Sequence, residues 1–338
     1  MGRSGYTRAD ALAGGTAADP VVSVEVLHIG AACRDIAADD PRGWRLGGGV
    51  TYAALTTARL GLATAAVVGV DLEARGASEL DLLRTAGVDL MLVPLREGPI
   101  YHNIETPAGR VQMCIQPGRP LPVQSLPESW LQAPGWMIAP VAGEVHDDWA
   151  TIIPERAFVA IAWQGSLRRL VAGERVSRKP PRASPLLRRA ELVGASHHDL
   201  DPDTPLEALF PLLAPDGRLL ITQGHEGGLL ISLDGDGHET LRYRSAETDD
   251  EIDPTGAGDT FLSALLATAV HRNLGGRQRG LLDLRVAAAA GSLVVEAPGL
   301  LGVPDRPAVL VRMVRERVRR FVEPSVAERV GSYRDGAS

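Results

Sequence analysis

A short run of small and acidic residues at positions 253–259 is the part of the sequence best suited to chemistry. It reads Asp-Pro-Thr-Gly-Ala-Gly-Asp and leads directly into an apolar, helix-like stretch. Small side chains before a helix leave backbone N–H groups unobstructed, and these groups, with the helix dipole, attract anions. Gly256, Ala257 and Gly258 could therefore hold a phosphate, or the charge that develops during phosphoryl transfer.

The acid that closes this run, Asp259, would lie beside such an anion in the first turn of the helix. Its carboxylate could orient an attacking hydroxyl and accept its proton. On spacing alone a second interpretation is equally good, in which the run is a plain turn and Asp259 a favourable first-turn acid. The run is not a Walker A loop, because no Gly-Lys-Ser/Thr follows it.

The elements that must position these residues follow an alternating pattern. The run 21–30 predicts a strand, 47–61 a glycine turn that opens a helix, 63–70 a strand and 77–87 a helix. This alternation favours βαβ units and a mainly parallel sheet. Later strands should be nearly continuously apolar, because helices cover both faces of such a sheet. Four runs fit this description: 136–140, 157–163, 190–196 and 218–224.

Three further segments depart from this alternation. The run 99–118 alternates, turns at 107–109 and alternates again, which is typical of a hairpin with a half-exposed face. Such a β-layer on an α/β body is a candidate lid. A second hairpin is expected at 229–244, and apolar residues at helical spacing in 306–323 predict a covering helix.

Composition and charge limit the classes of function. The chain has 338 residues, 45% hydrophobic and 23% charged, which suits one large α/β domain or two smaller ones. The net charge of −7 argues against binding to nucleic acid. The stretch 168–189 is locally basic and contains prolines. We interpret it as a solvated loop, with an anion-attracting rim as the alternative.

Cysteine usage and hydropathy point to a cytoplasmic protein. The two cysteines, Cys33 and Cys114, form no CxxC or Cys/His cluster, which argues against structural zinc and suits a reducing compartment. No apolar run approaches the roughly 18 residues of a membrane span. Residues 1–20 lack the apolar core of a signal peptide, and we expect them to form a loose tail.

The run 253–259 also resembles the second signature of the ribokinase/PfkB family of sugar and nucleoside kinases. The usual form of that signature is Asp-Thr-x-Gly-Ala-Gly-Asp, and only Pro254 departs from it. The resemblance continues, in the family's order, over about residues 21–305. It implies that Asp259 is the catalytic base for the substrate hydroxyl. It implies too that Gly256, Ala257 and Gly258 are the anion hole for the transferred phosphoryl group.

The acceptor side of the implied site begins at the family's first signature. Residues 47–54 resemble a glycine pair, Gly48 and Gly49, followed by a helix whose first turn meets the substrate. Tyr52 replaces the family's usual Asn, which puts a ribose-type contact in doubt. Asp35 matches the acid that receives substrate hydroxyls at the carboxyl edge of the sheet, as a carboxylate is suited to do.

Two stretches are similar to the myo-inositol kinase-like branch of the family. Residues 161–168 resemble its D-x-Q-G-x-x-R segment; Ala162 replaces the acid, while Gln164 and Arg168 remain as expected substrate contacts. The run 140–145 is also similar to that branch, and its Glu144 would face the cleft. The implied acceptor is a sugar or a cyclitol such as myo-inositol, with other sugars and nucleosides left open.

The nucleotide side of the implied site comes from two segments. Residues 221–228 resemble the family's T-x-G-x-x-G strand end, which lines the phosphates and ribose. Residues 286–304 are similar to the helix and loop that flank adenine, although close helix packing explains their small side chains equally well. The implied nucleotide-binding residues are Thr222, Gly224, Gly227, Ala288 and Gly291.

Cations enter the prediction at two places. Residues 194–200 fall where the family often has Asn-x-x-Glu, a motif tied to magnesium, and Ser196 and Asp199 occupy those positions. Asp199 can hold Mg²⁺ through water. The backbone around Asp253, beside Pro254, could hold a monovalent cation such as K⁺, as in several relatives. The resemblance thus implies ATP and Mg²⁺ as cofactors and allows K⁺.

From the resemblance we expect an α/β fold: a ribokinase-like, Rossmann-type three-layer sandwich with a mainly parallel central sheet and a small β-sheet lid. The expected organisation is a tail at 1–20, a kinase domain at 21–323 and a second tail at 324–338. The lid strands should fall within 31–46 and 99–118. The expected partner is a small-molecule substrate, with neither nucleic acid nor membrane, and a homodimer could form through the lid.

The expected function is ATP-dependent phosphorylation of a hydroxyl on a small polyhydroxylated molecule. Two alternatives share the fold: a nucleoside kinase and a non-catalytic regulator that binds a sugar or nucleotide. A dinucleotide-binding oxidoreductase is disfavoured, because no GxGxxG follows the first predicted strand.

Overall fold

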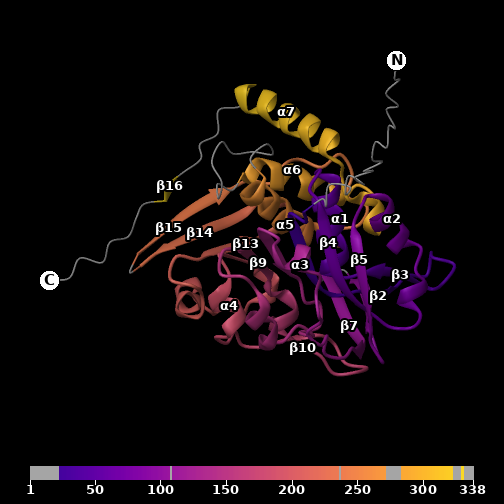
Figure 1. The fold of residues 1–338 in the computed structure, drawn as a ribbon. Coiled ribbons are helices and arrows are strands. Elements are labelled where there is room, and N and C mark those ends of the chain that lie inside the picture. The colour runs from indigo at the N-terminus through magenta and orange to yellow at the C-terminus, as the bar shows by residue number, and fades with distance from the viewer. Residues whose placement is uncertain (1–22, 107–108, 236, 272–282, 323–328, 331–338) are drawn as a thin grey trace, which may run out of the picture.

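A ten-stranded sheet organises the described part of the chain, which comprises residues 23–106, 109–235, 237–271, 283–322 and 329–330 (Figure 1). In this computed structural model the strands are β1 (Val26–Ala31), β4 (Thr64–Val70), β5 (Asp89–Pro94), β8 (Gly135–Ile138), β9 (Phe158–Ala162), β12 (Leu192–Ser196), β13 (Arg218–Thr222), β14 (Gly228–Asp234), β15 (Gly237–Tyr243) and β16 (Arg329–Val330). Their order is β16-β15-β14-β13-β12-β9-β8-β1-β4-β5. Pairings from β13 to β5 are parallel, and those from β13 to β16 are antiparallel.

Helices cover the sheet on both faces, which makes a three-layer sandwich. The helices are α1 (Gly49–Arg59), α2 (Glu79–Thr85), α3 (Glu128–Leu131), α4 (Pro185–Arg189), α5 (Ala257–Val270), α6 (Leu284–Val294) and α7 (Arg306–Val322). In Figure 1, α1, α2, α5, α6 and α7 lie above the sheet and α4 lies below it. The buried apolar residues accordingly form two clusters, one including Leu55 and Leu266, the other Trp136 and Trp149. The expected three-layer α/β architecture is therefore confirmed.

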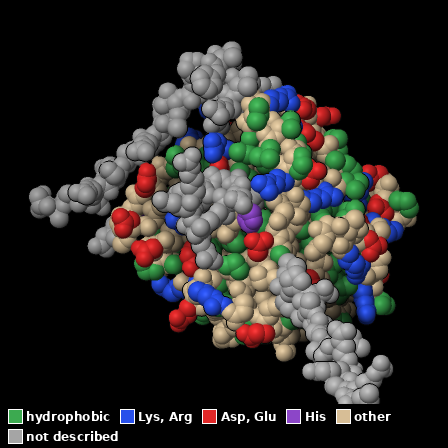
Figure 2. Space-filling model, turned by 45° about the horizontal axis from the view of Figure 1, so that its top comes forward, with side chains coloured by type: hydrophobic (Ala, Val, Ile, Leu, Met, Phe, Trp, Pro, Cys, Tyr) green, Lys and Arg blue, Asp and Glu red, His purple; other side chains and the backbone are tan. Residues whose placement is uncertain are grey.

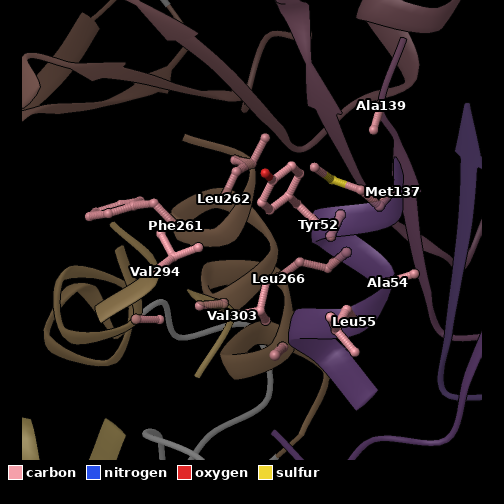
Figure 3. Packing of buried hydrophobic residues seen from close by; sticks show 14 of the residues in the cluster. Tyr52, Ala54, Leu55, Met137, Ala139, Phe261, Leu262, Leu266, Val294 and Val303 are labelled. Carbon is pink, nitrogen blue, oxygen red and sulfur yellow. The ribbon is translucent and has the colours of Figure 1, made fainter. Parts of the chain in front are cut away.

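The contact between α1 and α5 brings the two glycine-rich turns together. Leu55 of α1 and Leu262 and Leu266 of α5 belong to one buried cluster, and Tyr52 extends from α1 toward Leu262 (Figure 3). Each of these helices begins directly after a glycine with positive φ, Gly48 or Gly256. Because the helices pack against each other, their first turns meet at the carboxyl edge of the sheet.

A second, four-stranded sheet stands apart from the central one. Its strands are β2 (Cys33–Ile36), β3 (Trp44–Gly47), β6 (Pro99–Thr106) and β7 (Gly109–Pro117), in the order β3-β2-β6-β7. Only the β2–β6 pairing is parallel. This sheet, called the lid below, grows from the carboxyl end of β1 because Ala32 alone separates β1 from β2.

The basic stretch is not simply a solvated loop, because its first part, residues 168–178, forms a hairpin that joins the lid to the body. Strands β10 (Arg168–Arg169) and β11 (Ser177–Arg178) pair with each other. The turn between them bonds to β7: the Cys114 N–H donates to the Glu174 carbonyl over 2.9 Å, and the Val176 N–H to the Gln112 carbonyl over 2.8 Å. We call residues 168–178 the arginine hairpin.

The remaining elements follow the sequence closely. The expected hairpin at 229–244 is β14–β15, and the expected covering helix is α7. Figure 2 shows the face that carries α7, where apolar side chains stand among charged ones. None of the described helices is long and apolar enough to cross a membrane. The tails expected at 1–20 and 324–338 lie almost wholly outside the described residues.

Candidate active site

A cleft of about 1300 Å³ lies where the central sheet meets the lid. Its walls come from the carboxyl ends of β9, β12 and β13, the starts of α1 and α5, the lid and the arginine hairpin. This is the edge at which open parallel sheets bind ligands, because loops and helix N-termini converge there. The cleft brings together most of the site residues expected from sequence: Asp35, Gly48, Gly49, Tyr52, Gln164, Arg168, Asp199, Thr222, Gly224, Gly256, Ala257, Gly258 and Asp259.

The turn before α5 is shaped for close approach by a ligand. Gly256 has φ +80°, and a Cβ there would lie 2.2 Å from Cδ1 of Tyr52, so only glycine fits. Around Gly258 no atom lies within 4 Å of the corresponding Cβ position, which leaves its backbone open to the cleft. The Ala257 N–H makes a long bond of 3.4 Å to the Pro254 carbonyl. The turn therefore presents backbone amides and a helix N-terminus to the cleft.

Asp253 holds this turn in place. One carboxylate oxygen accepts the Thr255 N–H and the other accepts the Gly299 N–H, each over 3.0 Å. The side chain thus joins the turn to the loop that follows α6. Any cation at this position would rely on backbone carbonyls more than on the Asp253 carboxylate.

Asp259 lies half-buried in the first turn of α5 and lines the cleft. Burial raises its pKa to about 6, an effect that Arg168 opposes and Asp199 reinforces through their charges. Desolvation disfavours the ionised form, so the carboxylate binds protons more tightly than in water. A carboxylate with a pKa near 6 can act as a general base at neutral pH.

The glycines around the start of α1 make room for two carboxylates. A Cβ on Gly47 would lie 2.3 Å from Oδ2 of Asp35, and one on Gly49 would lie 2.7 Å from Oδ1 of Asp259. Packing therefore requires glycine at positions 47 and 49, because any side chain there would displace an acid that lines the cleft.

Asp35 stands on β2 at the end of a polar chain through the lid. The Gln112 amide donates to Oδ1 of Asn103 over 2.8 Å, and the Asn103 amide reaches Oδ1 of Asp35 over 3.5 Å. The Cys33 thiol lies 3.6 Å from Oδ2 of the same carboxylate. Sequence reasoning missed Asn103 and Gln112, whose only signal was polarity on alternate positions of a predicted strand.

Tyr52 combines a buried position with a place on the cleft wall. Its ring packs on Gly256 and beside Leu262 (Figure 3). Burial raises its pKa well above the ordinary value, so the phenol stays neutral. The residue that replaces the expected Asn is thus an aromatic support for the turn before α5.

Gln164 and Arg168 come from the short 3-10 turn after β9 and from β10. The Arg168 guanidinium lies 5.7 Å from the centre of the Tyr101 ring and donates to the Val141 carbonyl over 3.3 Å. The Tyr101 hydroxyl donates to the same carbonyl over 3.0 Å. These contacts aim the guanidinium into the cleft from the lid side.

The expectation that Glu144 faces the cleft is wrong. Its buried carboxylate accepts N–H bonds from Ala31, Val141 and Ala142 at distances between 2.8 and 3.2 Å. Burial raises its pKa, which these N–H bonds oppose. Glu144 ties the end of β1 to the loop after β8 and so supports the two segments that lead to Asp35 and Val141.

The expected nucleotide-binding residues divide into two groups. Thr222 and Gly224 line the cleft, whereas Gly227 does not; a Cβ on Gly227 would lie 2.1 Å from the Tyr243 carbonyl oxygen. Ala288 is buried in the core, and Gly291 packs against Phe261 with 3.4 Å between its Cβ position and a ring carbon. Neither lines the described cleft, so their roles at adenine stay predictions.

Asp199 reaches the cleft from the turn after β12, where one carboxylate oxygen accepts the Ser196 N–H over 2.9 Å. Within the described ranges, no three His, Cys, Asp or Glu side chains are grouped to hold a metal ion. This donor set suits Mg²⁺ that keeps its waters and phosphate ligands, and does not suit an all-protein cage.

Comparison with known proteins finds a family model that matches part of this chain. Residues 188–306 match the family model described as pfkB family carbohydrate kinase. No curated protein matches the chain.

Solved structures share the fold at low sequence identity. A pyrophosphate-dependent kinase in the ribokinase family, complexed with a pyrophosphate analog and myo-inositol, is 20% identical, with a TM-score of 0.61 over 84% of this chain and 99% of that one. The Methanocaldococcus jannaschii nucleoside kinase is 15% identical (TM-score 0.62; 87% and 99%). The Arabidopsis thaliana ribokinase with ribose and ATP is 17% identical (TM-score 0.60; 86% and 99%).

Proposed function

From the match of residues 188–306 to the pfkB family carbohydrate kinase model and from the ribokinase-like fold, we propose that this chain transfers a phosphoryl group to a hydroxyl of a small polyhydroxylated substrate. One observation carries the proposal: Asp259, with a pKa near 6, lies in the first turn of α5, directly after the glycine turn whose Gly258 has open space at its Cβ position. That pairing puts a base for a hydroxyl beside a binding place for a phosphoryl group.

The residues of the chain would divide the work as follows. When bound, a magnesium–nucleotide complex supplies the phosphoryl group and neutralises part of its charge. Asp259 orients the acceptor hydroxyl and takes its proton. The backbone of Gly256, Ala257 and Gly258 holds the developing negative charge at the start of α5. Asp35, fixed by Asn103, accepts hydroxyl protons of the acceptor in hydrogen bonds.

The donor would lie along the carboxyl ends of β12 and β13. Thr222 and Gly224 line that part of the cleft and suit phosphate groups. Asp199 has a second carboxylate oxygen for a water ligand of Mg²⁺. A monovalent cation beside Asp253 would bind to backbone carbonyls of the turn, whose position the Asp253 carboxylate fixes by accepting the Thr255 and Gly299 N–H groups.

A sugar or cyclitol is the acceptor that we favour, and myo-inositol is the first to test. The cleft has hydrogen-bonding groups for several hydroxyls in Asp35, Asn103 and Gln164. The similarity of residues 161–168 to the myo-inositol kinase-like branch supports the same choice. A nucleoside remains the alternative acceptor.

Inorganic pyrophosphate is a second candidate donor, and one observation favours it. None of the described residues 286–304, the segment expected beside adenine, lines the cleft, whereas Thr222 and Gly224, which are expected near the phosphates, do. A structural neighbour is a pyrophosphate-dependent kinase. Parallel assays with ATP and pyrophosphate would distinguish the two donors.

The decisive experiment measures donor consumption with a panel of inositols, pentoses, hexoses and nucleosides. We expect acceptor-dependent turnover that Asp259→Asn lowers by at least about 100-fold, while ATP still raises the melting temperature of the variant. Acceptor-independent consumption, or a near-normal rate in Asp259→Asn, would overturn the proposal, whereas the absence of turnover with every acceptor would favour a binding regulator.

A further inference from the structure

The arginine hairpin places three guanidinium groups on one wall of the cleft. Arg168, Arg175 and Arg178 all line the cavity. Arg168 is half-buried and Arg175 and Arg178 are exposed. The basic stretch of the sequence thus contributes a row of positive charge to the cleft.

These three arginines line the cleft and have no ion pair to a described carboxylate. Arg34, Arg42 and Arg312 each pair with acidic side chains. On the hairpin itself, the neighbouring Arg169 faces Glu174 over 3.6 Å. Arg168 instead donates one hydrogen bond to the Val141 carbonyl and lies over the Tyr101 ring. A half-buried guanidinium with most of its donors unused is suited to an anionic ligand.

The contacts of the hairpin indicate which half of the cleft each arginine belongs to. Arg168 touches Tyr101 of the lid and the Val141 carbonyl, both on the side of Asp35. The backbone of Arg175 forms an isolated antiparallel β-bridge with Met113 of lid strand β7. Only Arg178 turns the other way, to the His198 carbonyl beside Asp199. Arg168 and Arg175 therefore belong to the acceptor half of the cleft.

The donor phosphates are proposed to lie along β12 and β13 and at the start of α5, so they do not account for Arg168 and Arg175 on the lid side of the cleft. We propose that Arg168, assisted by Arg175, binds an anionic group of the acceptor, a carboxylate or phosphate that stands away from the reacting hydroxyl. This inference rests on the proposed kinase function. Among the sugars and cyclitols favoured above, it selects those that carry a carboxylate or a phosphate ester over neutral ones such as myo-inositol. A planar guanidinium can hold two oxygens of either group at once.

The test uses the full-length chain and acceptors in matched pairs: glucuronate and glucose, gluconate and glucitol, myo-inositol 1-phosphate and myo-inositol. We expect the wild type to use the anionic member of at least one pair with a kcat/KM about tenfold or more above that of its neutral partner. In Arg168→Gln that ratio should fall by about tenfold or more, and Arg168→Lys should lie between.

Arg169→Gln is the matched control, because Arg169 is adjacent, exposed and outside the cleft; its ratio should equal that of the wild type. Arg168→Lys keeps charge and stem, so it tests the idea even if Arg168→Gln unfolds. A wild type that prefers the neutral member of every pair would overturn the inference.

A second contrary result is an Arg168→Gln variant that loses both members of a pair equally while the KM of the donor rises. That outcome would place Arg168 on the donor phosphates. If no acceptor of either kind supports turnover, the proposed kinase function itself fails, which is a separate result.

Discussion

Gly49 and Asp259 meet at the floor of the cleft: a Cβ on Gly49 would lie 2.7 Å from Oδ1 of Asp259. The two residues open different helices, α1 and α5, whose packing brings their first turns together. The position of the proposed base therefore depends on the absence of a side chain on the neighbouring helix. This relationship leads to the first of four predictions.

Gly49→Ala should lower kcat by about 10- to 100-fold, because displacement of a catalytic group by about 1 Å costs that much. Alanine is otherwise favoured in a helix, so stability should change little. Steady-state kinetics and thermal unfolding would separate the effects. Gly76→Ala is the control, since no atom lies within 4 Å of its Cβ position; equal losses in both variants would contradict the argument.

The pH profile should report the ionisation of Asp259. A general base must be deprotonated, so kcat/KM for a neutral acceptor should fall as pH drops through the pKa of about 6. Arg168 lowers that pKa and Asp199 raises it. Arg168→Gln should therefore shift the acid limb to higher pH, and Asp199→Asn to lower pH. Shifts of the same sign in both variants would count against Asp259 as the titrating group.

Glu144→Gln should destabilise the fold by about 1–3 kcal/mol, because an amide cannot accept all the buried N–H bonds that the carboxylate accepts. Urea unfolding measures the change. The exposed Glu207 supplies a control, and Glu207→Gln should be close to neutral. If Glu144→Gln left the free energy of unfolding unchanged, the three N–H groups would have to find other acceptors.

The lid should not pair edge to edge with a second copy. The β7 edge is bonded to the arginine hairpin, and on β3 the Leu46 N–H donates to the Glu79 carboxylate over 3.0 Å. Edges satisfied within the chain are poor templates for strand pairing. Light scattering, which reports the molar mass in solution, should therefore show no dimer formed by edge pairing of the lid. A dimer that separates on Arg45→Pro would contradict this expectation.

Much of this architecture could be predicted because it is local. The alternation of strands and helices, the hairpins and the covering helix α7 all follow from periodicity and turn residues. The run 253–259 likewise shows a turn, a helix start and an acid in its first turn. Each of these depends on neighbours within a few positions, which the sequence displays directly.

Only the tertiary structure decided which distant residues meet. It turned Glu144 inward, packed Ala288 and Gly291 away from the described cleft, and set Asn103 beside Asp35. It also brought the basic stretch to the cleft through backbone bonds to β7. Such outcomes depend on how helices and sheets pack and on which polar groups find partners when water is excluded. The sequence by itself determined the phosphate-type turn and its acid, and packing decided what surrounds them.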